Sequence, residues 1–300
     1  MTRPWRSILA GIALLPLTLP LTLGTADGAG RSYDLFDGRQ SNDAAPLVIL
    51  LHGMAGTGGG LRITSGFDEF AAARGLVAAY PTAPERRWND GRWIALGQPD
   101  MAGRDDVGWI AALIDQLAGE GLVDAEQVYL LGHSNGGGMA MKIACDRPDL
   151  IKGVAIVSTK ALIDAPCPDA EPVSAIFFHG TDDIVAPHGG RSADNEHIFA
   201  QPLGDTHSAA ETVRLWAGRN RCAGAGPAMP SDPDPTDQTT LEITDWARCA
   251  APLRQVDMIG GGHAYPGAPE IRYPPARRAL GPPIRDIDAG EAALAFWFDR

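Results

Sequence analysis

Residues of three types that could cooperate in nucleophilic catalysis follow one another along the chain. Ser134 lies in the stretch YLLGHSNGGGMA, and His263 lies far downstream in MIGGGHAYPG. Between them, the stretch FFHGTDDIV contributes two carboxylates, Asp182 and Asp183. A serine hydroxyl becomes a good nucleophile when a histidine accepts its proton and a carboxylate orients that histidine. Serine, then aspartate, then histidine is one chain order in which this trio occurs, so these positions are candidates for such a site.

The residues around Ser134 predict a sharp turn from a strand into a helix. EQVYLLGH is apolar enough for a buried strand, and NGGGMAMKIAC opens a helix with small residues. Gly132 and Gly136 lie two positions before and after the serine, where larger side chains would clash in such a turn. The N-terminus of the helix would also favour negative charge beside the serine. The alternative is a glycine-rich turn without chemistry, and the downstream acid and base argue against it.

A site of this kind also needs two backbone N–H groups that stabilise the oxyanion of the reaction. The residue after the nucleophile, Asn135, supplies the first. The stretch LLHGMAGTGGG predicts the second at Met54, because Gly53 and the run from Gly56 to Gly60 would let the backbone approach a substrate. The same stretch lacks the G-K-[ST] ending of a phosphate-binding loop, so nucleotide binding is not indicated.

Short apolar runs recur along the chain and predict a layered α/β architecture. Runs of four to eight residues that are apolar on both faces are typical of buried parallel strands. They are PLVILLHG, GLVAAYPTA, QVYLLGHS, IKGVAIVST, VSAIFFHGTDD and LRQVDMIGGGH, and an edge strand is expected in RSYDLFDGR. Helical patterns such as DDVGWIAALIDQLAGEG lie between them. We therefore expect one domain with a mostly parallel sheet, and surface loops at 223–240 and 265–286.

The place of each candidate relative to these runs supports the choice of His263. It follows the last strand, as the two aspartates follow an earlier one, and open α/β sheets place their sites at the carboxyl edge of the strands. The other histidines, among them His52 and His133, compete poorly with His263 and are assigned no role.

The net charge and the N-terminal segment indicate which partners and which cellular location to expect. A formal charge of −12 over 300 residues argues against binding to nucleic acid. Residues 1–26 carry a basic head, an apolar run interrupted by prolines and a small-residue cleavage site, which is typical of a secretory signal peptide. We therefore expect a secreted protein, extracellular or periplasmic, with no stable membrane association after cleavage. An uncleaved membrane anchor is the alternative.

Four cysteines become informative if the chain is exported. Cys145, Cys167, Cys222 and Cys249 allow three pairings. In an oxidising compartment, pairing the neighbours in sequence is the simplest choice, and buried free thiols are the alternative. None of the spacings is that of a zinc or redox motif, so no metal site is expected.

Several stretches together resemble one family, and they occur in the same order from about residue 32 to the C-terminus. They are LLHGMAGTGGGL, WNDGRW, RDDVGWIAALIDQL, GHSNGGGMAMKIACDRPDL, HGTDDIVAPHGG and GGGHAYPG. Their combination resembles the secreted polyhydroxybutyrate-depolymerase-like esterases, which include feruloyl esterases. The resemblance implies an α/β-hydrolase fold with helices on both faces of the sheet, ester substrates and no cofactor.

The resemblance also implies roles for individual residues. It places the triad acid at Asp183 rather than Asp182, and it implies the pairs Cys145–Cys167 and Cys222–Cys249. The chain departs from the family at Tyr265, where a tryptophan is common. It also ends directly after its last helical pattern, so we expect residues 27–300 to form a single catalytic domain without a separate polymer-binding domain.

These observations predict a secreted serine esterase acting on hydroxyalkanoate oligomers or feruloyl-type esters. Trp88, Trp93 and Tyr265 are candidates for the substrate cleft, although each tryptophan could equally belong to the core. An acyltransferase with the same triad, and a non-catalytic binding protein on the same fold, remain as alternatives. The expected partner is a small ester or oligoester.

Overall fold

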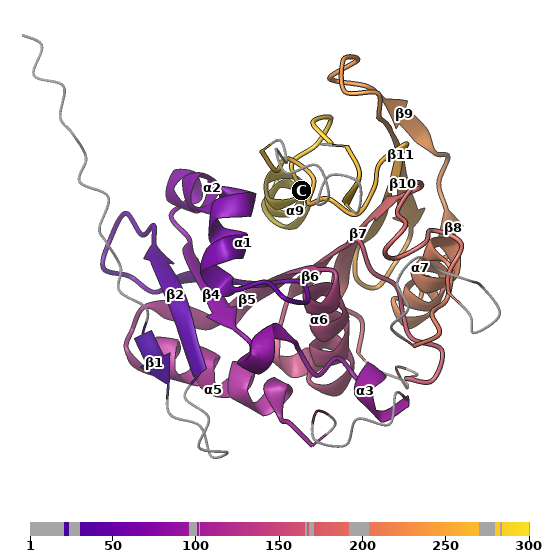
Figure 1. Ribbon diagram of the computed structural model, residues 1–300. Coiled ribbons are helices and arrows are strands. Elements are labelled where there is room, and N and C mark those ends of the chain that lie inside the picture. Colours follow the sequence, from indigo (N-terminus) through magenta and orange to yellow (C-terminus); the bar gives the residue numbers. More distant parts are fainter. Residues whose placement is uncertain are drawn as a thin grey trace, which may run out of the picture.

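A mixed β-sheet forms the centre of the protein. The computed structural model describes residues 21–23, 31–95, 101, 103–165, 167, 171–191, 204–269, 280–282 and 284–299. Within these residues the strand order is β1-β2-β4-β3-β5-β6-β7-β11-β10-β8, and β9 pairs with β10 (Figure 1). The parallel part consists of β3 (Ala45–Leu51), β4 (Val77–Thr82), β5 (Val123–His133), β6 (Gly153–Val157), β7 (Ser174–Gly180) and β11 (Leu253–Ile259). Antiparallel strands flank it: β1 (Leu21–Leu23) and β2 (Arg31–Asp37) on one side, and β8 (Gly224–Ala225), β9 (Met229–Ser231) and β10 (Thr240–Ala247) on the other.

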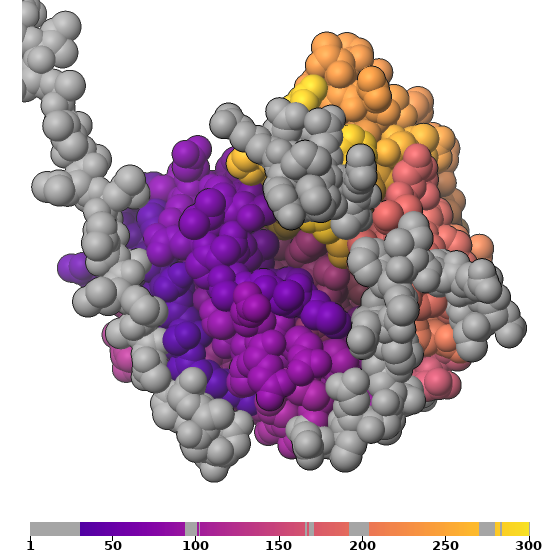
Figure 2. Space-filling view, viewed as in Figure 1, coloured from indigo at the N-terminus to yellow at the C-terminus, as the bar shows by residue number. Residues whose placement is uncertain are grey.

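Helices cover both faces of this sheet, as the resemblance implies. One face packs against α5 (Asp106–Gly119), α6 (Asn135–Asp146) and α7 (Ala209–Arg219). The other packs against α1 (Gly58–Ser65), α2 (Phe67–Arg74) and α9 (Ala289–Phe298). Short helical turns complete the described elements: η1 (Pro84–Arg86), α3 (Arg92–Ala95) and η2 (Pro148–Leu150). At the surface, the indigo and purple N-terminal parts lie on the left of the view and the orange residues around β9 and β10 at the upper right (Figure 2).

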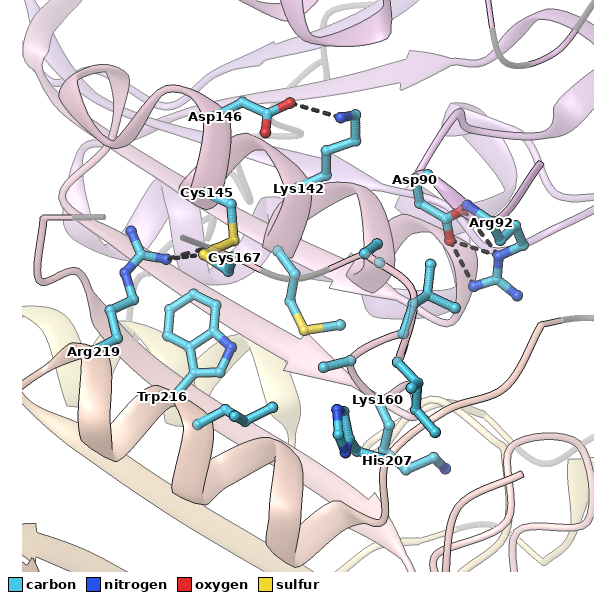
Figure 3. A pocket seen from close by; sticks show the side chains of 18 residues that line it. Asp90, Arg92, Lys142, Cys145, Asp146, Lys160, Cys167, His207, Trp216 and Arg219 are labelled. Atoms are coloured by element: carbon cyan, nitrogen blue, oxygen red, sulfur yellow. Dashed lines mark hydrogen bonds and ion pairs between the residues drawn. A yellow bond between two sulfur atoms is a disulfide. The ribbon is translucent and has the colours of Figure 1, made fainter. Parts of the chain in front are cut away.

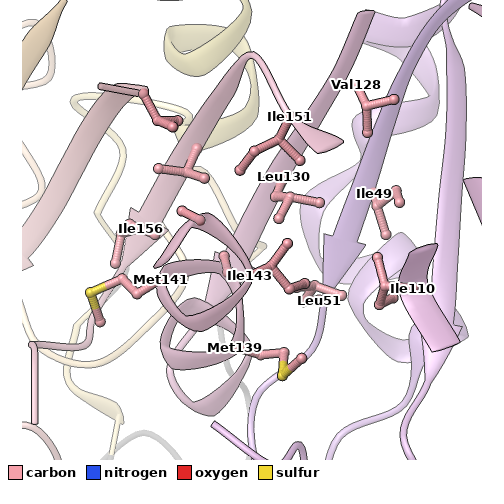
Figure 4. Packing of buried hydrophobic residues seen from close by; sticks show 14 of the residues in the cluster. Ile49, Leu51, Ile110, Val128, Leu130, Met139, Met141, Ile143, Ile151 and Ile156 are labelled. Atoms are coloured by element: carbon pink, nitrogen blue, oxygen red, sulfur yellow. The ribbon is translucent and has the colours of Figure 1, made fainter. Parts of the chain in front are cut away.

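The apolar strands build two cores because successive side chains point to opposite faces. In β3, Leu47, Ile49 and Leu51 belong to the core under α5 and α6, whereas Val48 and Leu50 belong to the core under α1, α2 and α9. All five side chains are fully buried. Figure 4 shows α6 packed into the first of these cores. Burial on both faces explains why the run is apolar throughout instead of alternating.

Three expectations about the elements need correction. The predicted loop 223–240 contains two short strands, β8 and β9, which pair with β10. In the full chain β2 is not the outermost strand, because β1 pairs with it; β1 lies within the predicted signal peptide, so removal of residues 1–26 would leave β2 at the edge. The glycine run after β3 is partly helical: Gly58 begins α1, and a Cβ at Gly58 would lie 1.9 Å from the carbonyl oxygen of Tyr80. That glycine therefore lets α1 pack on β4 and does not face a substrate.

Two disulfides join the pairs that were expected. Cys145 is bonded to Cys167 and Cys222 to Cys249. No described helix has the length and apolar character needed to cross a membrane. Most of the predicted signal peptide, residues 1–20 and 24–26, lies outside the described residues, as do 270–279 and 283 of the second predicted loop.

A buried ion pair connects β2 to the start of α5 and generates a stability prediction. Arg31 Nη1 lies 2.5 Å from Asp106 Oδ1, and both side chains are almost fully buried. The N–H of Asn89 donates to the second carboxylate oxygen at 2.6 Å. Asp106→Ala should therefore lower the free energy of unfolding by about 3–5 kcal/mol, because it leaves a buried guanidinium without its carboxylate.

Urea unfolding of the two matched variants checks this. Asp149→Ala removes one partner of an exposed pair with Arg147 and should unfold at nearly the wild-type urea concentration. Equal unfolding midpoints for the two variants would contradict the structural importance of the buried pair.

Candidate active site

Ser134 occupies a strained turn between β5 and α6. Its backbone has φ 54° and ψ −120°, a conformation that residues other than glycine rarely adopt. A Cβ at Gly132 would lie 2.2 Å from the carbonyl oxygen of Gly136, and a Cβ at Gly136 would lie 2.0 Å from that of Leu51. The N–H of Ser134 donates to the carbonyl of Val157 in β6 at 2.8 Å. Close packing that only glycine permits therefore holds the serine in this conformation.

A continuous hydrogen-bonded row connects Ser134 to Asp183. His263 Nε2 lies 2.9 Å from Ser134 Oγ, and His263 Nδ1 lies 2.7 Å from Asp183 Oδ2. With its proton on Nδ1, the imidazole donates to the carboxylate, and Nε2 is free to accept the hydroxyl proton. The three residues come from the turns after β5, β7 and β11, which the parallel sheet brings to one edge. The row can activate a hydroxyl for attack on an electrophilic carbon.

The two neighbouring aspartates differ sharply in their surroundings. Asp183 is 4% exposed, and its Oδ1 accepts from the N–H groups of Val185 (2.8 Å) and Ala186 (2.7 Å). Burial opposes ionisation of this carboxyl, but the hydrogen bonds from His263 and Ala186 prevail, and its pKa is lowered. Asp182 is exposed, and its Oδ1 accepts from the hydroxyl of its neighbour Thr181. The geometry therefore brings Asp183, and not Asp182, to the imidazole.

The two predicted oxyanion donors lie in turns next to the serine. A Cβ at Gly53 would lie 3.3 Å from Ser134 Cβ, so the turn after β3 touches the serine directly. Among the described residues, no acceptor is found for the backbone N–H of Met54 or of Asn135. Both N–H groups are thus available to a ligand.

His52 fixes the peptide that carries the N–H of Met54. Its Nδ1 donates to the carbonyl of Gly53 at 2.7 Å, and the N–H of Gly56 donates to the same oxygen at 3.0 Å. The C=O and N–H of a trans peptide point in opposite directions, so anchoring the Gly53 carbonyl orients the N–H of Met54. His52 Nε2 accepts from the N–H of Ala83 at 3.0 Å, and burial lowers the pKa of His52, which keeps the ring neutral in this role.

Two further side chains support the site and were not found from the sequence. Asn135 Oδ1 accepts from the N–H of Trp88 at 2.7 Å, and Asn135 Nδ2 donates to the carbonyl of Trp88 at 3.1 Å. His133 Nε2 donates to the carbonyl of His263 at 2.9 Å, and burial lowers the pKa of His133 to about 4. Both residues adjoin Ser134 in the sequence, which could have drawn attention to them. Their partners, Trp88 and His263, are 47 and 130 residues away.

The three aromatic candidates for substrate contact lie in the interior, and the two tryptophans thus follow the core alternative. Trp88 has no exposed surface, and Trp93 and Tyr265 are 3% exposed. The indole N–H of Trp88 donates to the carbonyl of His52 at 3.0 Å, and that of Trp93 donates to the carbonyl of Trp88 at 2.8 Å. The tryptophans therefore brace the backbone next to the two predicted oxyanion donors. The Tyr265 ring packs edge-on against His133.

A cavity of about 260 Å³ lies along the outer side of α6 (Figure 3). Gly138 and Met141 of α6, Trp216 of α7, and Lys160 and Leu162 after β6 contribute to its wall. Its described lining residues do not include Ser134 or His263. The described residues contain no group of three or more His, Cys, Asp or Glu side chains that could hold a metal ion.

Comparisons with known proteins point to esterases. The family model described as "Esterase PHB depolymerase" matches residues 32–175. The protein named "Putative esterase NocK" from Nocardia uniformis subsp. tsuyamanensis is 31% identical over 85% of this chain and 74% of its own length. Feruloyl esterase B from Piromyces equi is 26% identical over 76% of this chain, but only 41% of that protein is covered. Among solved structures, acetyl xylan esterase from Aspergillus awamori superposes with a TM-score of 0.56 at 16% identity, covering 87% of this chain and 98% of that one. This likeness shows the α/β-hydrolase fold.

Substitution of each aspartate in turn tests the geometry at His263. Asp183→Asn should lower kcat/KM for a soluble ester by about 10⁴, because the imidazole is then held in the wrong tautomer and its protonated form loses its carboxylate. Asp182→Asn is the matched control and should keep most of the turnover. Steady-state kinetics on folded, purified variants decides between them, and the reverse pattern would move the acid one residue back.

Proposed function

Because the chain belongs to the PHB depolymerase esterase family and is a carboxylic ester hydrolase, we propose that it hydrolyses esters through Ser134, His263 and Asp183. The observation that carries the proposal is the unbroken row from Ser134 Oγ through both ring nitrogens of His263 to Asp183 Oδ2. The strained backbone at Ser134 supports it, since strain of this kind persists where function requires it.

The reaction begins with attack of Ser134 Oγ on the ester carbonyl carbon. His263 Nε2 takes the hydroxyl proton and then gives it to the departing alcohol, which leaves an acyl group on Ser134. A water molecule next loses its proton to His263 and attacks the acyl-enzyme, which releases the acid and restores the serine. Asp183 stays ionised throughout and stabilises the imidazolium that forms in each step.

Negative charge on the carbonyl oxygen develops in both steps. The N–H groups of Met54 and Asn135 are proposed to bind this oxygen, because both lie in turns beside Ser134 and neither has an acceptor among the described residues. The first peptide of α6 adds the positive end of the helix dipole. His52 contributes indirectly, by holding the peptide of Met54.

The substrate class and the site of action are proposals from the relatives and the sequence. The names of the family and its relatives favour esters of hydroxyalkanoic or hydroxycinnamic acids. We propose that residues 1–26 are a signal peptide and that the protein acts outside the cytoplasm. Two disulfides support this, because they persist in oxidising compartments.

Replacing the proposed nucleophile gives the direct kinetic test. Ser134→Ala should lower the hydrolysis rate by several orders of magnitude and leave the fold intact, because alanine fits the same turn. A panel of acetyl, feruloyl and 3-hydroxybutyrate-oligomer esters measures the loss, and near-ultraviolet circular dichroism checks the fold. A folded variant with substantial activity on any ester that the wild type cleaves would rule out Ser134 as the nucleophile.

A further inference from the structure

Two buried cations hold the loop that carries Asp183 from behind. Arg191 Nη2 donates to the carbonyl of Val185 at 2.6 Å, and Lys160 Nζ donates to the carbonyl of Ala186. Lys160 is 3% exposed and Arg191 is 9% exposed. Val185 and Ala186 are also the residues whose N–H groups donate to Asp183 Oδ1. The loop thus presents its N–H groups to the carboxylate and its carbonyls to the cations.

One peptide connects a cation directly to the carboxylate. The bond between Val185 and Ala186 carries the carbonyl that accepts from Arg191 and the N–H that donates to Asp183 Oδ1 at 2.7 Å. Its dipole is therefore aligned between a positive and a negative charge, and each hydrogen bond polarises the other. Arg191 thereby acts on Asp183 without touching it.

Charged and titratable groups from several elements surround Lys160, and His207 lines the same cavity beside it (Figure 3). The loop contributes Asp183, His188 and Arg191; β7 contributes His179; and β11 contributes Asp257, which pairs with His188 at 3.0 Å. Burial, with Lys160 and His188 nearby, holds the pKa of His179 well below its usual range, so that ring is neutral. Arg92 faces Arg191 and is itself paired with Asp90 at 2.6 Å.

Lys160 carries its charge in the pH range in which a histidine base titrates. Burial lowers its pKa to about 8, Asp183 opposes this shift, and Arg191 adds to it. The side chain is therefore protonated near pH 6. Nothing in the reaction steps requires a buried lysine, so its contact with the acid loop calls for an explanation.

We propose that Lys160 and Arg191 are positioning residues that hold Asp183 through its loop, and that their positive charge opposes proton uptake by the Asp183–His263 pair. They would thereby set the pH below which the enzyme loses its base. The proposal rests on the proposed function, because it assigns the two cations to the triad acid.

The sign of a shift in the pH profile separates this role from simple support of the loop. Removing a nearby positive charge favours proton uptake by the Asp183–His263 pair and moves the acid limb of kcat/KM to higher pH. If the substitution merely released the loop, Asp183 would move away, His263 would lose a negative neighbour, and the limb would move to lower pH.

The experiment measures kcat/KM of the full chain for a soluble ester between about pH 4.5 and about pH 9. This range brackets the ordinary pKa of histidine. Lys160→Met should move the acid limb up by roughly half a pH unit, the effect of one screened unit charge several ångströms away. Arg191→Gln keeps a donor for the Val185 carbonyl but removes the charge, and should shift the limb in the same direction. Lys152→Met removes an exposed lysine that is paired with Glu126, and should leave the limb in place.

An unchanged or lowered limb in Lys160→Met would overturn the proposal. If that variant does not fold, Arg191→Gln decides by the same criterion. Failure of the proposed function is recognised separately: Asp183→Asn would then keep its activity. If Asp183→Asn is inactive while the acid limbs of Lys160→Met and Arg191→Gln stay at the wild-type pH, only the role of the two cations is rejected.

Discussion

The close approach of α6 to β3 and β5 is the constraint on which the proposed site depends. Only a glycine at 136 allows the start of α6 to lie against the carbonyl of Leu51, and only a glycine at 132 allows β5 to pass beneath it. This contact forces Ser134 into its positive-φ conformation. It also puts the N–H of Asn135 beside the turn that carries Met54. A larger side chain at either glycine would displace the serine from His263 and from both amides.

The site is then fixed by polar side chains that are themselves buried. His52 anchors the peptide of Met54, and His133 anchors the backbone of His263. Both rings are neutral because burial lowers their pKa values, so they support the site without adding charge next to the imidazole. Lys160 and Arg191 carry positive charge on the far side of the acid loop, where they donate to the carbonyls of Ala186 and Val185. Such a network positions reacting groups only when nearly every member has a partner.

Local patterns predicted the sheet and the region of the hydrogen-bonded row, because buried strands are apolar on both faces and Asp182, Asp183 and His263 follow the ends of two of them. The choice of Asp183 over Asp182 came from the family resemblance. What the sequence missed depends on contacts between distant residues: the bonds of Asn135 to Trp88, and of His133 to His263. For Trp88 the sequence left the substrate cleft and the core open, and its indole is buried with its N–H on the carbonyl of His52. The proline- and aspartate-rich stretch 223–240 hid two short strands, because their pairing comes from β10.

Covalent trapping tests most directly whether Ser134 is the nucleophile. The full chain is incubated with a fluorophosphonate, which reacts with activated serines, and the site of attachment is identified by peptide mass mapping. The structure predicts a single adduct on the peptide that carries Ser134, formed at a rate that falls as His263 becomes protonated. An adduct on a different serine, or continued ester hydrolysis by fully labelled protein, would contradict the assignment of Ser134, His263 and Asp183 as the catalytic row.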